Sequence, residues 1–149
     1  MTKTPMDIAL DEARAAAARG EVPVGAVILD PATRDVIAAA GNRTRELNDP
    51  TAHAEILAIR AACAARRDER LTGLDLYVTL EPCAMCAGAI SFARLRRLYY
   101  GADDPKGGAI TSGPRFFGQP TCHHAPEIYD GIGGEAAATL LRDFFRQKR

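Results

Sequence analysis

The 149-residue sequence lacks the long apolar run that a membrane helix requires. Such a helix takes about 18 or more consecutive apolar residues, and no stretch of the chain approaches that length. The first five residues, Met-Thr-Lys-Thr-Pro, also lack the apolar segment of a secretory signal. We therefore expect a soluble, cytoplasmic protein that does not associate with a membrane.

An excess of charge of either sign is also missing. The chain carries 19 basic and 19 acidic side chains, so its formal net charge is zero. This balance excludes a protein that grips nucleic acid by bulk positive charge, because that mode of binding depends on many basic groups facing phosphates. Basic residues do gather at 94–97 and 142–149. These two clusters are either a local patch for a partner or ordinary solvated surface.

Cysteines are few, and two of the four stand only three positions apart. This number and spacing do not suggest the disulfide framework of a small secreted protein. A chain of this length buries roughly two-thirds of the surface that it exposes when unfolded, which is enough for a core without disulfides. We expect one domain over residues 1–149, with the paired cysteines acting as ligands.

The order of apolar patterns predicts an α/β fold. A helix begins with a Thr4 cap and Pro5 and runs to Gly20. The elements expected after it are a hairpin of strands 22–29 and 36–40, helix 54–66, strand 74–80, helix 82–94, strand 95–101, a long loop 102–134 and helix 135–146. Because strand, crossover helix and strand follow one another, we expect a mixed sheet covered by helices.

Two short motifs predict a metal site. Cys83 and Cys86 lie at positions i and i+3 of the first turn of the helix expected to start at Pro82, so they share one face. The positive end of the helix dipole favours thiolate over thiol at these positions. His53, where the preceding loop becomes a helix, is the candidate third ligand.

Glu55 has a different expected role. Residues two apart on a regular helix point in different directions, so Glu55 is not expected to bind the same ion as His53. We expect its carboxylate beside the ion, within reach of a bound water. Three protein ligands and one water make an open catalytic site, in which zinc lowers the pKa of the water to about 7. A neighbouring carboxylate can then take the proton and deliver it to a leaving group.

Other interpretations of the cysteines stay open at this point. A Cys-x-x-Cys pair is also found in redox proteins and in closed structural zinc sites, which Cys122, His123 and His124 could complete. Cys122 alternatively packs within a loop. Cys63, inside an apolar helix, is expected to be a small core residue.

The motifs His-x-Glu and Pro-Cys-x-x-Cys resemble the signature of zinc nucleobase deaminases. Flanking segments extend the likeness to nearly the whole chain, and they are residues 21–27, 41–43, 49–55, 77–88 and 140–146. Together they resemble the bacterial tRNA-specific adenosine deaminases. The resemblance implies a three-layer α/β/α sandwich around a five-stranded mixed sheet, a homodimer and one Zn²⁺ per subunit. It also implies conversion of the wobble adenosine of an arginine tRNA anticodon to inosine.

The resemblance also assigns roles to individual residues. It implies that His53, Cys83 and Cys86 bind zinc and that Glu55 shuttles protons. The substrate-binding positions that it implies are Asn42 at the base, backbone groups around Ala54 and near Cys83 at the developing tetrahedral centre, and Asp104, Phe145 and Arg146 at the anticodon loop. Core packing is the alternative role for Phe145.

Several alternatives remain at the level of sequence. The same metal chemistry serves a deaminase of a free nucleobase or nucleoside such as guanine or cytosine, and a zinc-stabilised binding module needs no catalysis at all. The segment 112–124 does not match the family pattern securely. Instead of a homodimer, a monomer would pack Ile90, Phe92 and Leu95 in its own core.

Overall fold

The computed structural model describes residues 3–148, so residues 1, 2 and 149 of the terminal segments considered above lie outside it. Its centre is a five-stranded sheet with the order β2-β1-β3-β4-β5. The strands are β1 (Gly25–Asp30), β2 (Asp35–Gly41), β3 (Asp75–Leu80), β4 (Arg97–Ala102) and β5 (Glu127–Tyr129). β1 is antiparallel to β2 and β3, whereas β3, β4 and β5 are parallel. The predicted hairpin and the mixed sheet are confirmed.

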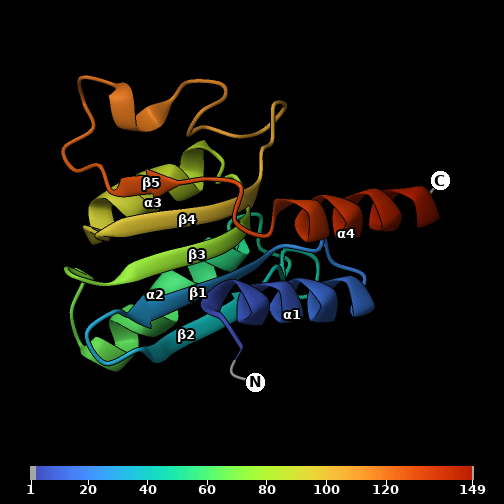
Figure 1. Ribbon diagram of the computed structural model, residues 1–149, viewed down its shortest axis with the longest axis horizontal. Coiled ribbons are helices and arrows are strands. Elements are labelled where there is room, and N and C mark those ends of the chain that lie inside the picture. Colours follow the sequence, from blue (N-terminus) through green and yellow to red (C-terminus); the bar gives the residue numbers. More distant parts are fainter. Residues whose placement is uncertain (1–2, 149) are drawn as a thin grey trace.

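Four helices cover the two faces of this sheet (Figure 1). They are α1 (Pro5–Ala18), α2 (Ala54–Arg66), α3 (Ala84–Ala93) and α4 (Gly134–Gln147). α1 and α4 lie on one face, and α2 and α3 lie on the other. The predicted three-layer α/β/α fold is therefore confirmed. No helix among residues 3–148 combines the length and hydropathy that crossing a bilayer would take.

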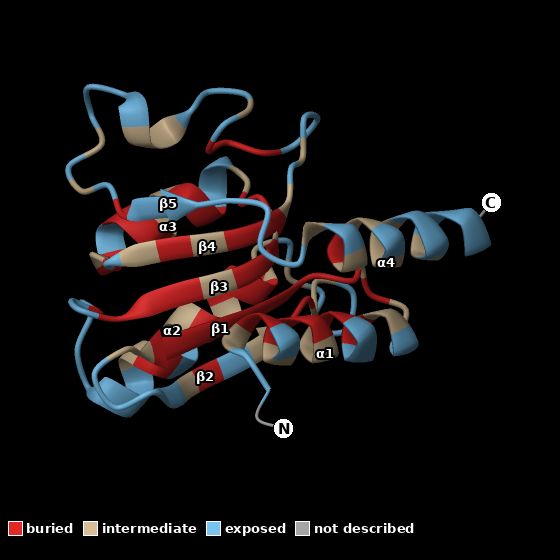
Figure 2. Ribbon diagram, viewed as in Figure 1, coloured by how far each residue is buried: buried red, intermediate tan, exposed pale blue. Residues whose placement is uncertain are grey.

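The strands alternate between two cores, because successive side chains of a strand point to opposite faces. On β3, Leu76 and Val78 join the larger core beneath α2 and α3, whereas Tyr77 packs against the smaller core beneath α1 and α4. Figure 2 shows the inner strands almost wholly buried. The central strands are therefore a rigid support for the segments that leave their ends.

The amino end of α3 differs from the prediction. The helix begins at Ala84, not at Pro82, and Cys83 is its N-cap. Backbone hydrogen bonds hold the preceding segment extended: the Glu81 N–H donates to the Ala102 carbonyl, and the Ala109 N–H donates to the Pro82 carbonyl. Ala102 and Ala109 are distant in sequence from residues 81–82. Local signals for a helix start do not include them and therefore predict a start that is too early.

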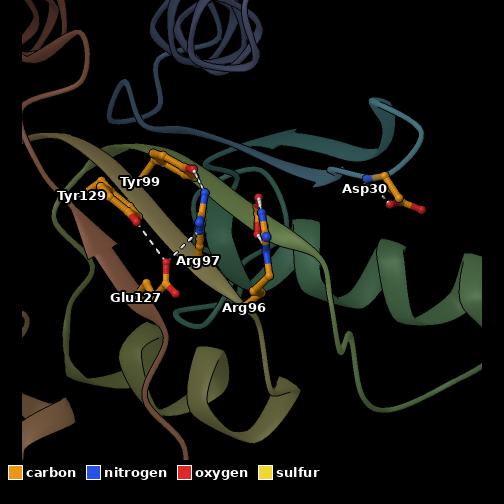
Figure 3. Close-up of polar contacts among 8 residues, drawn as sticks. Asp30, Arg96, Arg97, Tyr99, Glu127 and Tyr129 are labelled. Carbon is orange, nitrogen blue, oxygen red and sulfur yellow. Dashed lines mark hydrogen bonds and ion pairs between the residues drawn. The ribbon is translucent and has the colours of Figure 1, made fainter.

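The sequence predicts a loop over residues 102–134, but the region is not entirely a loop. It contains a short 3₁₀ helix (Phe116–Gly118) and the edge strand β5. All three residues of β5 are exposed, so the strand lacks the apolar alternation that would reveal it. Side chains help to hold it: Arg97 donates hydrogen bonds to Glu127 and Tyr99, and the Tyr129 hydroxyl donates to Glu127 (Figure 3).

We expect Gly25→Ala to destabilise the fold strongly. A Cβ at Gly25 would collide with the Ala9 carbonyl and would lie 2.7 Å from the Ala13 nitrogen, so α1 would have to move off β1. Overpacking of this kind costs about 1–3 kcal/mol, and backbone atoms yield less than side chains. Thermal unfolding measures the loss. Gly118→Ala is the control, because nothing lies within 4 Å of its added Cβ, and an equal loss in both variants would contradict the packing argument.

Candidate active site

Three candidate ligands converge at the amino ends of α2 and α3. His53 is the N-cap of α2, Cys83 is the N-cap of α3, and Cys86 lies on the first turn of α3. The Nδ1 atom of His53 lies 3.6 Å from the Sγ atom of each cysteine. Because both helices direct their positive ends at this point, the site favours thiolates.

The spacing of these atoms fits a tetrahedral zinc ion. Zinc bonds of about 2.0–2.1 Å to nitrogen and about 2.3 Å to sulfur, at a tetrahedral angle, separate the two ligand atoms by about 3.6 Å. The ligand atoms of His53, Cys83 and Cys86 all lie within 4.8 Å of one another, and no fourth His, Cys, Asp or Glu among residues 3–148 joins this group. The residues therefore fit a metal site with an open fourth position.

The electrostatics of the cluster favour a metal ligand at Cys83. The hydrogen bond from Cys86 lowers the pKa of the Cys83 thiol to about 4, so this sulfur is a thiolate at neutral pH. That bond, together with burial, raises the pKa of the donor Cys86. A metal ion binds the deprotonated forms of such side chains and releases the proton that Cys86 holds.

Glu55 lies beside the cluster and not within it. It is the second residue of α2, its side chain is 4% exposed, and it borders the same cavity as His53 and Cys83. Burial raises the pKa of its carboxyl to about 7. A carboxyl group with a pKa near neutrality both accepts and releases a proton readily at pH 7. The geometry therefore suits an acid-base group and not a fourth ligand.

A cavity of about 350 Å³ opens onto this cluster. It is lined by Val22, Val24, Asn42, Thr44, His53, Glu55, Leu80, Glu81, Cys83, Asp104 and Gly107. Its walls are thus partly apolar, with a few polar groups that converge near the candidate ligands. This composition is typical of a site for a small planar molecule or part of one.

The predicted substrate residues divide into two groups. Asn42 and Asp104 line the cavity, and Ala54 is buried at the first position of α2 beside it. Phe145 and Arg146 lie away from the cavity, on the exposed end of α4. Phe145 is 50% exposed, so the alternative of core packing is wrong for it.

The alternative of a closed structural site is also wrong, because its candidate ligands lie elsewhere. Cys122 Sγ lies 3.6 Å from the Ser91 hydroxyl, and His124 Nε2 lies 2.7 Å from the Leu95 carbonyl oxygen. His123 is exposed. Cys63 packs against the larger core while partly exposed, which agrees with its expected role as a small packing residue.

Two buried carboxylates near the cavity were not predicted. Glu21 accepts hydrogen bonds from the backbone N–H groups of Arg45 and Glu46, and Glu81 accepts several from the segment after β4. Their sequence signal is an acidic residue beside an otherwise apolar strand. An acidic residue at such a position is unusual because its carboxylate is buried. The sequence does not reveal which distant backbone N–H groups donate hydrogen bonds to that carboxylate.

Known proteins share this arrangement. The family model for the cytidine and deoxycytidylate deaminase zinc-binding region matches residues 1–102. A protein of Agrobacterium fabrum named tRNA-specific adenosine deaminase is 66% identical over 144 residues, which cover 97% of this chain and 93% of that protein. The chain belongs to the tRNA-specific adenosine deaminase family. It is therefore an enzyme of the hydrolytic deaminase type, and His53, Cys83 and Cys86 are positioned to hold its metal.

Solved structures agree with this membership in the deaminase family. One, from a study of A-to-I editing by tRNA:A34 deaminases at the wobble position of transfer RNA, matches with a TM-score of 0.90 and 65% identity, covering 92% of this chain and 98% of that one. A guanine deaminase from Nitrosomonas europaea matches with a TM-score of 0.82 and 26% identity, covering 94% and 82%. The fold is thus shared by deaminases of different substrates.

We expect Cys83→Ser and Cys86→Ser each to bind well under half of the zinc that the wild-type deaminase holds, about one ion per chain. Each change removes one of three protein ligands, whereas Cys122→Ser removes none. Elemental analysis of the purified, dialysed proteins measures the metal content. A loss of zinc in Cys122→Ser comparable to that in Cys83→Ser would contradict the three-ligand assignment.

Proposed function

We propose that this enzyme converts adenosine to inosine at the wobble position of a tRNA anticodon, with an arginine tRNA as the expected substrate. The observation that carries the proposal is the three-ligand cluster with an open position beside the buried Glu55, in a chain 66% identical to a tRNA-specific adenosine deaminase. Hydrolytic removal of an amine needs this combination of an activated water and a group that transfers protons.

The proposed chemistry assigns the proton transfers to Glu55. A zinc ion held by His53, Cys83 and Cys86 would lower the pKa of a bound water to about 7. The Glu55 carboxylate takes one proton from the attacking water and delivers it to the ring nitrogen of adenine. It then takes the second proton from the hydroxyl that the water leaves on C6 and delivers it to the amine, which departs as ammonia. Its buried position beside the cavity and its raised pKa support this role.

The remaining cavity residues orient the base and the developing charge. The backbone N–H groups around Ala54 and next to Cys83 are at helix amino ends, where they stabilise negative charge as it forms. Asn42 lines the cavity together with His53 and Glu55. We propose that Asn42 contacts the base and that the apolar walls exclude water around its ring.

An anticodon loop suits the charge and shape of the molecule. Recognition of single-stranded RNA relies on bases turned out into pockets and on stacking more than on a broad basic face, and this mode is compatible with a formal net charge of zero. We assign Asp104, at the cavity wall, to the backbone of the anticodon loop. Phe145 and Arg146 are exposed at the carboxyl end of α4, and we assign them to the same RNA loop.

Deamination of a free base such as guanine is the second candidate. The likeness to the guanine deaminase of Nitrosomonas europaea favours it, because the fold and metal chemistry are compatible with either substrate. Incubation with an anticodon stem-loop and with free guanine, cytosine and adenosine separates the two. Inosine in the RNA with little ammonia from the free compounds supports the proposal, and the reverse pattern supports the alternative.

We expect Glu55→Gln to keep its zinc and to lower kcat on the anticodon stem-loop by about 10²-fold or more, because loss of a positioned acid-base group costs roughly 10²–10⁴-fold. Inosine formation and elemental analysis on the same sample measure the two effects. Glu135→Gln is the matched control, since Glu135 is an exposed residue of α4 far along the chain from the site. Full activity in Glu55→Gln would exclude the assigned proton transfer.

We propose that the enzyme is a homodimer whose copies meet on the α2–α3 face. The monomer alternative placed Phe92 in the core, but its side chain is 78% exposed, whereas Ile90 and Leu95 are fully buried. Phe92 borders a surface hollow together with Ile59 of α2. A large apolar side chain exposed beside such a hollow favours a self-complementary contact with a second copy.

We expect Phe92→Glu to shift the protein toward monomer, since it places a charge in the proposed contact. Light scattering during size-exclusion chromatography gives the mass, compared with 16.0 kDa for one chain. Val36→Glu is the control, because Val36 is an exposed apolar residue on the edge strand β2, away from α3. A wild-type protein that elutes as a monomer at micromolar concentration would rule out this dimer.

A further inference from the structure

Glu81 is a buried charged residue that the chemistry above does not use. It lies between the end of β3 and Cys83, and it is 2% exposed. Its Oε2 atom accepts hydrogen bonds at 3.0 Å from the N–H groups of Ile110, Thr111 and Ser112, and its Oε1 atom accepts from the Asp104 N–H at 2.9 Å and the Ser112 hydroxyl at 3.0 Å. Every one of these donors belongs to the single segment 104–112, which we call the wall loop.

The wall loop is shaped to receive this carboxylate. Three consecutive backbone N–H groups that point at one oxygen form an anion-binding nest, and here the anion belongs to the protein itself. Gly108 permits the close approach, because an added Cβ would lie 2.6 Å from both the Glu81 Oε2 atom and the Asp104 carbonyl oxygen. The loop therefore wraps around Glu81 and takes its shape from it.

The wall loop also forms part of the cavity. Asp104 and Gly107 line the cavity that contains His53 and Glu55. The Ala109 N–H donates a hydrogen bond to the Pro82 carbonyl, which joins the same loop to the segment that leads into Cys83. Glu81 is not a member of the ligand cluster, so its charge is satisfied by the loop and not by an ion.

We propose that Glu81 is a positioning residue that holds the wall loop where it binds the RNA nucleotides around the target base. The proposal rests on the proposed function, because it names the residue that shapes the RNA-binding wall of the same site. The groups assigned to proton transfer lie on α2, outside the wall loop. Loosening the loop should therefore weaken substrate binding more than it slows the chemical step.

The test compares Glu81→Gln with Asp75→Asn. Asp75 is a carboxylate buried to the same extent at the other end of β3, where it accepts hydrogen bonds from Arg96 at 2.9 and 2.7 Å. The two positions are six residues apart along extended chain, a distance of about 20 Å. Both variants lose a buried negative charge, but only Glu81→Gln releases the wall loop. Amide hydrogen exchange, zinc content and steady-state kinetics on an anticodon stem-loop are measured for each.

For Glu81→Gln we expect faster exchange at residues 110–112, a KM about tenfold higher or more, kcat within about threefold of wild type and unchanged zinc. Asp75→Asn should unfold at a lower temperature with KM unchanged. Ser112→Ala removes one of the five hydrogen bonds and should raise KM about two- to threefold, so it carries the test if Glu81→Gln does not fold.

The proposal is overturned if KM in Glu81→Gln and Ser112→Ala stays at the wild-type value, if Asp75→Asn raises KM equally, or if Glu81→Gln loses zinc and kcat together. Failure of the proposed function has a different signature, since the wild-type enzyme would then leave the stem-loop unchanged. In that case hydrogen exchange at residues 110–112 and KM for guanine are measured in Glu81→Gln to test the positioning role. A wild-type value of either quantity overturns that role.

Discussion

The candidate site depends on one constraint, the placement of two helix amino ends against the same edge of the sheet. β3 and β4 are parallel and α3 crosses between them, so α3 must begin where β3 ends. α2 begins at the same edge, and it brings His53 to within 3.6 Å of the two α3 cysteines. Three ligands from two distant parts of the chain thus meet without any irregular structure beyond two N-caps. The apolar strands beneath them keep this geometry fixed.

Buried glutamates around the cavity have different environments, and hydrogen-bond donors make the difference. Glu81 has five donors from the wall loop, and Glu21 has two backbone N–H donors from the loop that follows β2. The hydrogen bonds to Glu55 come from its own backbone N–H and from Cys86, and they do not offset burial, which raises the pKa of its carboxyl to about 7. A carboxylate rich in donors holds a loop in place, whereas one poor in donors exchanges protons.

Much of the fold could be predicted because its signals are local. The Thr4 cap and Pro5 at the start of α1 are confirmed, with Thr4 and Asp7 forming a capping box. The His53, Cys83 and Cys86 cluster could be predicted from motif spacing, since helix geometry fixes where i and i+3 side chains point. What failed depends on distant partners. Pro82 is held extended by Ala109, and β5 is stabilised by β4 and by Arg97 although its own three residues carry no apolar pattern. The roles of Glu21 and Glu81 were missed for the same reason.

The brevity of β5 has a consequence for association between molecules. An edge strand offers unpaired backbone groups that can template strands of other chains, and short edges with charged side chains suppress this. β5 spans only Glu127–Tyr129, and its Glu127 carboxylate is engaged by Arg97. The sheet therefore cannot easily be extended by a second copy at this border, which disfavours fibre-like aggregation.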